Sequence, residues 1–371
     1  MDSQSLWLRL SRMPGATIQN LQLLLESFGS IEAVFDASRA ELEPVLPDQE
    51  RFIGALLGES EAASLEHDLE WLQQEHNHLL PFTDERYPEL LLQSVGAPAT
   101  LFVTGDVDVL RFPQLAVVGS RNPTAGGEEN ARAFSAAFVR SGMVITSGLA
   151  QGIDAAAHEA AIAAGGKTVA VMGTGLRRVY PAANRELAHE IARHGALVSE
   201  FPLDTPPRRE NFPRRNRIIA ALSLGTLVVE AAVKSGSLIT ARLAGEHGRE
   251  VFAIPGSIHS ALAKGCHRLI RQGAKLVETA GDVLEELEPI VGALREQQIV
   301  EEKQPARVSA EFSGLLRIIG YDPVDINQLV ERSGLTAEVI SSMLLKMELE
   351  GVVETGPGGK YQRSVNVVAT H

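Results

Sequence analysis

The sequence predicts an α/β protein whose central domain has a doubly wound, mostly parallel sheet with helices on both faces. From residue 115 onward, short β-rich runs alternate with Ala- and Arg-bearing helical stretches, which is the pattern of such a sheet. Polar, glycine-containing turns follow several runs, at the strand ends where these sheets bind ligands. The expected strands are Leu115–Val118, Met143–Thr146, Thr168–Met172, Ala196–Ser199, Thr226–Glu230, Glu250–Ile254 and Lys275–Val277.

Bulk composition narrows the class of protein. A chain of 371 residues is long enough for two or three domains, and 44% hydrophobic with 22% charged residues is typical of a globular protein. The single cysteine, Cys266, forms no intrachain disulfide, which favours a cytoplasmic location. We expect no signal peptide in residues 1–12. We expect no membrane span in residues 155–172, which contain His158, Glu159 and Lys167.

Charge is spread unevenly along the chain, whose net charge is −13. Residues 1–105 carry 5 Lys/Arg against 17 Asp/Glu, residues 106–285 carry 21 against 17, and residues 286–371 carry 8 against 13. Only the middle segment therefore has an electrostatic basis for binding a polyanion, and the small excess requires a focused patch.

The N-terminal segment is expected to be helical. Leu21, Leu24, Leu25 and Phe28 follow helical spacing and stop at Gly29. Ser30 then suits the N-cap of a following helix. Short helices joined by tight turns indicate a SAM-like or helix-hairpin-helix bundle for residues 1–80. Its acidity favours a scaffolding or protein-contact role over binding of a nucleic-acid backbone.

A basic island at Pro207–Arg217 packs five arginines and Phe212 into eleven residues. Guanidinium groups bind phosphate through two parallel hydrogen bonds, and a base can stack on an aromatic ring. The alternative explanation is a solvated surface loop whose arginines pair with some of the chain's many carboxylates. The other arginines of the island are Arg208, Arg209, Arg214 and Arg215.

Three turns accompany this island. Gly119, Ser120 and Arg121 follow an expected strand, where backbone amides and a guanidinium suit a phosphate. The turn is no dinucleotide fingerprint, so we expect no such cofactor. Ser235–Ser237 suits a helix cap that presents small donors, and Ile254–Ser257 ends a further expected strand.

Asp154 and His158 are four residues apart and share a helix face. An acid–base pair is one interpretation, but without a nucleophile or a metal partner a structural role is favoured. We expect no metal at Cys266 and His267, because adjacent ligands alone do not make a zinc site.

Five motifs follow one another in the chain: Gly119–Arg121, Ser147–Asp154, Phe212–Ala220, Ser235–Thr240 and Ile254–Gly256. Together, over roughly residues 80–285, they resemble the DprA (Smf) family of DNA-processing proteins. The resemblance implies an extended Rossmann-like domain over residues 81–288. The chain departs from the family pattern at Ala221 and at His267, where a packed neutral histidine is favoured over a pH-sensitive one.

The resemblance implies a homodimeric, non-enzymatic protein that binds single-stranded DNA without sequence preference. It further implies protection of incoming DNA and loading of RecA onto it during natural transformation. Carried over by position, the DNA contacts are Arg121, Phe212, Arg215 and Arg217, with Asn216 beside them. The residues that shape the pocket are Gly119, Ser120, Ser235, Gly236 and Ser237, while Arg208, Arg209 and Arg214 are nearby charges.

A different class of function stays open from the residues. Related Rossmann-like folds include nucleotide phosphoribohydrolases, in which Arg121, Glu200 and Glu230 would contact phosphate and ribose. That family's Pro-Gly-Gly-x-Gly-Thr run is absent before Glu230.

The C-terminal part is expected to be a linker followed by a winged helix. Residues 289–306 are acidic and suit a linker. In residues 307–371, the expected helices Glu311–Ile319, Asp325–Ser333 and Thr336–Glu350 precede a short strand and the turn at 356–359. The third helix is too acidic to favour DNA recognition, so a protein-contact or regulatory role is expected.

Overall fold

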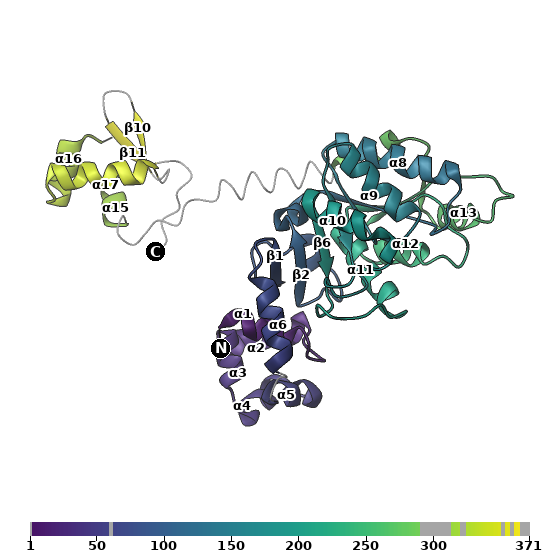
Figure 1. Cartoon of the computed structure of the whole chain (residues 1–371). Coiled ribbons are helices and arrows are strands. Elements are labelled where there is room, and N and C mark those ends of the chain that lie inside the picture. The colour runs from purple at the N-terminus through teal and green to yellow at the C-terminus, as the bar shows by residue number, and fades with distance from the viewer. Residues whose placement is uncertain are drawn as a thin grey trace. The chain divides into compact units, whose positions relative to one another are not determined.

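The computed structural model describes residues 2–58, 62–289, 313–319, 324–349, 353–356 and 360–363. The chain divides into two compact units, Met1–Glu288 and Pro289–His371 (Figure 1). The predicted linker at 289–306 lies outside the described residues except for Pro289.

The first unit is built on a nine-stranded sheet with the order β1-β2-β6-β5-β4-β3-β7-β8-β9. The strands from β6 to β9 pair in parallel, and β2 pairs antiparallel with both β1 and β6. The prediction of a mostly parallel Rossmann-like sheet is therefore confirmed. The strands are β1 (Asn77–Pro81), β2 (Thr100–Gly105), β3 (Gln114–Val118), β4 (Val144–Ser147), β5 (Thr168–Val171), β6 (Ala196–Ser199), β7 (Gly225–Val228), β8 (Glu250–Ala253) and β9 (Lys275–Leu276).

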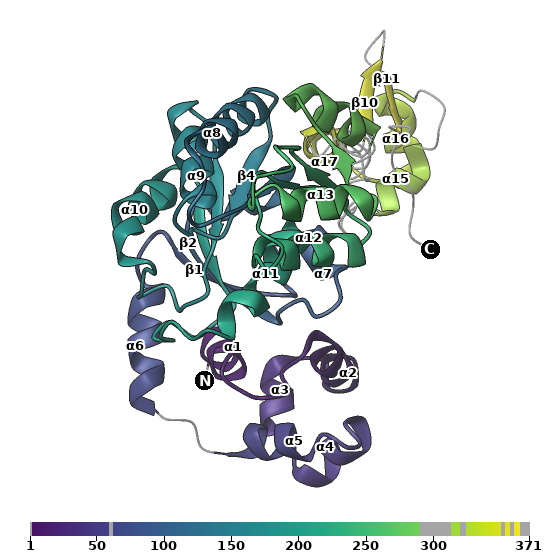
Figure 2. The same ribbon diagram turned by 90° about the vertical axis from the view of Figure 1, so that its right-hand side faces the viewer.

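Helices cover both faces of this sheet, as the alternating pattern predicts. Figure 2 shows the layer of α8 (Ala125–Arg140), α9 (Ile153–Ala163) and α10 (Arg185–His194) on one face. The opposite layer contains α11 (Asn211–Leu222), α12 (Ser237–Glu246) and α13 (Lys264–Arg271). Every residue of β3, β4 and β5 is buried, as expected for parallel strands covered on both faces.

The two antiparallel strands β1 and β2 are absent from the sequence prediction. The short helix α7 (Glu89–Leu92) lies between β1 and β2, and the 3-10 helix η1 (Val107–Arg111) lies between β2 and β3. The strands β1 and β2 extend the sheet toward the N-terminal helices. Because β2 pairs with β6, their place in the sheet depends on contacts between segments distant in sequence. A second 3-10 helix, η2 (Ala182–Asn184), precedes α10.

Short helices form the N-terminal segment, as predicted. Gly29 ends α2 at φ +82°, a conformation that glycine adopts readily. The Ser30 side chain accepts the amide of Ala33 at 3.2 Å, so the predicted N-cap is confirmed. The helices are α1 (Ser3–Leu10), α2 (Ile18–Phe28), α3 (Ile31–Asp36), α4 (Arg39–Val45), α5 (Glu50–Leu57) and α6 (Ala62–Leu72).

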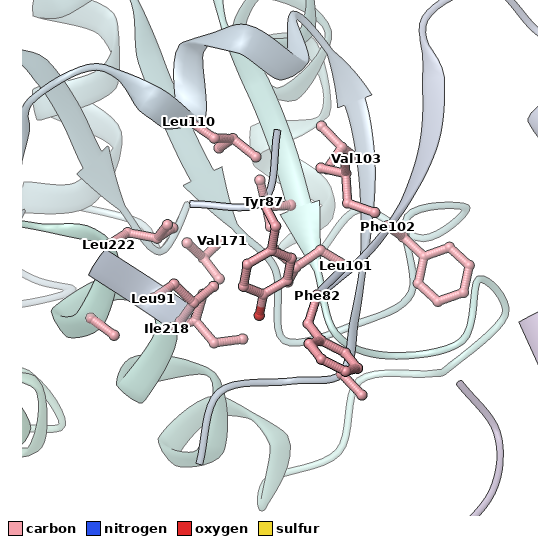
Figure 3. Packing of buried hydrophobic residues seen from close by; sticks show 14 of the residues in the cluster. Phe82, Tyr87, Leu91, Leu101, Phe102, Val103, Leu110, Val171, Ile218 and Leu222 are labelled. Carbon is pink, nitrogen blue, oxygen red and sulfur yellow. The ribbon is translucent and has the colours of Figure 1, made fainter. Parts of the chain in front are cut away.

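One hydrophobic core joins these helices to the sheet. The Trp7 ring meets Phe82 edge-on at 5.9 Å between centroids, and Trp71 meets Phe102 at 6.1 Å. Figure 3 shows Tyr87 in this core, with its hydroxyl donating to the carbonyl of Pro98 at 2.6 Å. Burial raises the pKa of Tyr87. The N-terminal helices therefore pack on the sheet as part of one body.

The second unit has the expected winged-helix architecture. The helices α15 (Ser313–Ile319), α16 (Ile326–Ser333) and α17 (Ala337–Leu349) precede the paired strands β10 (Val353–Gly356) and β11 (Lys360–Arg363). A separate core includes Leu329, Ile340 and Leu344. The predicted start of the first helix at Glu311 and the centre of the predicted wing turn, residues 357–359, lie outside the described residues.

The end of β2 generates a test of this packing. Gly105 has φ +114°, and an added Cβ would lie 2.3 Å from the Gly195 carbonyl oxygen. We expect Gly105→Ala to lower the free energy of unfolding by roughly 3 kcal/mol, from backbone strain plus overpacking. The control Gly142→Ala has φ +84° and open space around the new methyl group, so strain alone should cost about 1–2 kcal/mol. Urea denaturation measures both; equal losses would contradict the close contact.

Candidate functional site

A cavity of about 690 Å³ opens at the carboxyl ends of the central strands. The chain builds the sheet outward from β3 through β4, β5 and β6, and then returns to the other side of β3 with β7. Sheets of this kind bind ligands where the strand order reverses. We call this cavity the switch-point pocket. Its walls come from the turn after β3, the start of α11, and the segment from Ala232 into α12.

The turn after β3 forms the first wall. An added Cβ on Gly119 would lie 2.6 Å from the Ile153 side chain, so only glycine fits this close approach. The Ser120 hydroxyl accepts the amide of Asn122 at 3.1 Å. Arg121 is exposed and its guanidinium lies 5.9 Å from the centre of the Phe212 ring. The turn thus presents a cation to the pocket.

The second wall is the start of α11, which contains most of the basic island. The segment from Asn211 onward is helical, so the loop interpretation is wrong for that part. The pairing of arginines with carboxylates that belonged to it is confirmed for Arg214 and Arg217. Phe212 lies 5.4 Å from the Tyr180 ring, tilted by 45°. Tyr180 is 46% exposed and lines the pocket. Sequence reasoning missed it, although an aromatic residue soon after the β5 run was a usable signal.

Arg215 forms the floor of the pocket and is only 5% exposed. Its Nη1 donates to the carbonyl of Gly148 at 2.6 Å and to the carbonyl of Val171. Burial lowers the pKa of Arg215 to about 10, so the group stays charged at neutral pH. Both carbonyls follow or end central strands, and the guanidinium therefore ties α11 to the ends of β4 and β5.

Asp154 holds the same turn from the other side. Its Oδ2 accepts the amides of Gly148 at 3.1 Å and Ala150 at 3.4 Å. Between them, buried Leu149 has φ +58°, a conformation that is costly for this residue. The pKa of Asp154 is raised by burial, against the opposing effect of Arg215. Asp154 and Arg215 together fix a strained turn below the cavity.

His158 is fully buried and contacts a residue of β5 rather than Asp154. Its Nδ1 lies 2.7 Å from the Thr168 hydroxyl, and its Nε2 is buried without a hydrogen-bond partner among the described residues. The acid–base interpretation of this pair is therefore wrong, because each member is engaged elsewhere. The structural alternative fits both residues.

The third wall runs from Lys234 to the start of α12. Gly236 is the N-cap of α12 and no side chain caps it there. The Ser235 hydroxyl instead accepts the amide of Ser237 at 3.3 Å and lies 2.7 Å from the Ser237 hydroxyl. The predicted serine cap is replaced by this local pair. The side-chain Nδ2 of Asn216 donates to the carbonyl of Gly236 at 3.3 Å, which joins α11 to this wall.

The structure brings most of the predicted site residues to the switch-point pocket and leaves two elsewhere. Arg214 and Arg217 lie on another face of α11, in a separate groove of about 830 Å³. Arg209, predicted only as a nearby charge, and Lys234, which was not predicted, also line the pocket. The predicted residues that line the pocket are Gly119, Ser120, Arg121, Phe212, Arg215, Asn216, Ser235, Gly236 and Ser237.

Arg214 and Arg217 share one buried carboxylate. Both donate to Oε2 of Glu200, Arg214 at 3.0 Å, and the Glu200 side chain is only 2% exposed. Burial lowers the pKa of Arg217, and Glu200 opposes that effect. Helical spacing explains the separation, because residues 212, 215 and 216 face the pocket while 214 and 217 do not.

The carboxylates of the phosphoribohydrolase hypothesis do not meet in one cavity. Glu200 lines the groove that contains Arg214. Glu230 accepts the amide and hydroxyl of Thr124 at 2.9 and 2.7 Å. Neither lines the switch-point pocket with Arg121, so the geometry lends that hypothesis no support.

Two features are absent from the described part of the chain. No group of three or more His, Cys, Asp or Glu side chains there is placed to hold a metal ion. No helix within the same residues is both long and apolar enough to cross a membrane.

Comparisons with known proteins match both units. A family model described as DNA recombination-mediator protein A matches residues 78–288, and a DprA winged helix domain model matches residues 300–359. Protein Smf of Escherichia coli is 44% identical over 83% of this chain and 84% of its own length. DNA processing protein DprA of Streptococcus pneumoniae is 49% identical over 55% of this chain and 72% of its own length.

Solved structures give the same result. The X-ray structure of DNA processing protein A from Streptococcus pneumoniae matches with a TM-score of 0.65 and 38% identity, over 76% of this chain and 95% of that one. A structure of DNA processing protein A from Helicobacter pylori, described as giving insight into the single-stranded DNA binding mode of that protein, matches with a TM-score of 0.52 and 28% identity, over 57% of this chain and 96% of that one.

Buried His158 generates a prediction about acid stability. Burial lowers the pKa of His158 to about 3, below the value of about 6.5 in an unfolded chain. The unfolded state then binds the proton more readily, so stability present above pH 6.5 is lost as the pH falls toward 3. We expect the free energy of unfolding to fall by about 2 kcal/mol between pH 6.5 and pH 5 because of His158 alone. Urea denaturation at a series of pH values measures this fall.

The variant His158→Gln removes this contribution and should show a shallower pH dependence than the native chain. Exposed His189 on α10 supplies the matched control, His189→Gln. Parallel pH profiles for the native chain and His158→Gln would contradict the assignment.

Proposed function

Because this chain belongs to the DprA (Smf) family of DNA-processing proteins, we propose that its switch-point pocket binds single-stranded DNA without sequence preference. The observation that carries this proposal is the exposed Arg121 guanidinium beside the Phe212–Tyr180 ring pair. Cations and aromatic faces in one groove are what sequence-tolerant single-strand binding requires. The single-stranded DNA binding mode described for the Helicobacter pylori protein supports the same proposal.

The proposed roles follow from exposure and partners. Arg121, Arg209 and Lys234 contact phosphates, because all are exposed and line the pocket. Phe212 and Tyr180 stack on bases. Asn216 and Arg215 position the walls. The remaining residues bring small donors or bare backbone close to the strand: Gly119, Ser120, Ser235, Gly236 and Ser237.

Arg214 and Arg217 have a smaller part in this proposal. Their guanidiniums already contact Glu200, and each would have to leave a buried carboxylate to reach a phosphate. They contribute general positive charge to the surface of α11. Phosphates and ring faces carry no base identity, so binding is independent of sequence.

We further propose that the chain acts without catalysis, as a recombination mediator in the cytoplasm. It protects incoming single strands and loads RecA onto them during natural transformation. A homodimer formed through the Rossmann-like domain would place two pockets on one strand and raise avidity through effective concentration. Light scattering gives the mass of the particle, and a monomer at micromolar concentration would remove the dimer from the proposal.

A division of labour among four segments belongs to the same proposal. Residues 1–80 form an acidic helical domain for protein contacts, and residues 81–288 bind DNA. Residues 289–306 link them to the winged helix at 307–371. An acidic α17, with Glu338 and Glu348 exposed, favours a regulatory or protein-contact role for the winged helix.

Two substitutions separate charge from stacking in the pocket. Arg121→Ala removes a phosphate contact, so the slope of log affinity against log salt should fall by about 0.7. Phe212→Ala removes a stacking face and should weaken binding by about 1–3 kcal/mol while the slope stays unchanged. Fluorescence anisotropy with an oligothymidylate over a range of NaCl concentrations measures both quantities.

The matched control is Arg140→Ala, an exposed arginine at the end of α8 that lies outside the pocket. Duplex DNA of the same length provides the second comparison. Tighter binding of duplex than of single strands, or an unchanged slope for Arg121→Ala, would overturn the proposed site.

RecA loading has its own test. On single strands coated with single-strand-binding protein, the native chain should shorten the lag before RecA hydrolyses ATP. Arg121→Ala should shorten it less, because the variant holds the strand more weakly. A lag that the native chain leaves unchanged would refute the loading role while leaving DNA binding intact.

A further inference from the structure

A second basic groove adjoins the switch-point pocket. This cavity of about 720 Å³ runs along α12 toward α13, the start of β8 and the turn that precedes β9. It shares Lys234, Ser235 and Ile239 with the switch-point pocket. The two cavities therefore meet at the N-terminal end of α12. We call this cavity the α12 groove.

The charges that line the α12 groove are mostly positive. Lys234, Arg242, Arg249 and Arg268 line it, and Glu250 is the one carboxylate among its lining residues. An oxygen of Glu250 lies 3.5 Å from Nζ of Lys275, so that negative charge is already paired. A local excess of cations stands out in a chain whose net charge is −13.

Several of these cations are available to a ligand. Arg268 is exposed and makes no ion pair with any described residue. Arg242 pairs with Glu246 one turn away, with side chains 63% and 52% exposed, and exposed pairs of this kind contribute little. Arg249 is only partly exposed, and its Nη2 donates to the carbonyl of Leu90 at 3.4 Å, so Arg249 is less available than Arg268 and Arg242.

We propose that the α12 groove is a second phosphate-binding subsite for the single strand held in the switch-point pocket. The strand passes over Lys234 and Ser235, which border both cavities, and places a further run of phosphates beside Arg268 and Arg242. A polyanion suits this path because one continuous backbone can contact both cavities. The inference rests on the proposed function and extends its site.

The experiment compares oligothymidylates of about four and about twenty nucleotides, a range that covers short and long single-strand sites. Arg268→Gln should weaken binding of the long strand and lower its log–log salt slope by about 0.7. It should leave the short strand unaffected, because the switch-point pocket alone holds that strand. Arg242→Gln should act in the same direction.

Arg271→Gln is the matched control. Arg271 is exposed on α13, three residues from Arg268, and lies outside the α12 groove. It should bind both strands as the native chain does. Light scattering and urea denaturation on both variants establish that mass and stability are equal before affinities are compared.

Several results would overturn the inference. One is equal binding of the long strand by Arg268→Gln and Arg271→Gln; another is an equal loss for short and long strands. Poly-glutamate serves as a second probe. If Arg268→Gln binds both DNA strands as the native chain does but binds poly-glutamate more weakly, the groove takes an acidic protein segment and not DNA. If the native chain binds the short strand but Arg268→Gln has no selective effect on the long one, the proposed function stands and the second subsite does not. If the native chain binds neither strand, the proposed function and the second subsite are both wrong.

Discussion

The site depends on a buried guanidinium that joins a helix to the ends of two strands. Arg215 projects from α11 and donates to carbonyls at the ends of β4 and β5. Asp154 accepts amides of the same turn from the side of α9. Opposite charges on the two sides of a strained backbone turn compensate each other's burial. The floor of the switch-point pocket is therefore fixed by the fold before any ligand arrives.

That constraint divides α11 into two faces with different chemistry. Because Arg215 points inward, Phe212 and Asn216 lie on the pocket side, while Arg214 and Arg217 meet Glu200 on another side. The basic island is thus one cluster in the sequence and two in space. The exposed cations that line the pocket are Arg121, Arg209 and Lys234, which come from three different segments.

Much of the fold follows from local patterns, since buried parallel strands show as short β-rich runs separated by helices. The run at residues 100–104 of β2 carries the same β-rich signal and was missed. Its antiparallel pairing with β1 and β6 could not be read from the sequence, because it depends on segments distant along the chain. The motifs placed Arg121 and Phe212 in one predicted site, and the structure has them in contact. They carried no information on the burial of Arg215, which depends on packing between segments distant in sequence. Tyr180 lies outside the five motifs, and its ring contact with Phe212 depends on the same kind of packing.

The most direct test of this account is the substitution Arg215→Lys, which keeps the charge and removes the fork that reaches two carbonyls. Hydrogen exchange at the amides of Gly148 and Ala150, measured together with the salt dependence of single-strand binding, separates the two roles of Arg215. If Arg215 positions the turn, Arg215→Lys should exchange these two amides faster and bind single strands more weakly, with an unchanged salt slope. Native exchange with a slope lower by about 0.7 would make Arg215 a direct phosphate ligand and contradict the account.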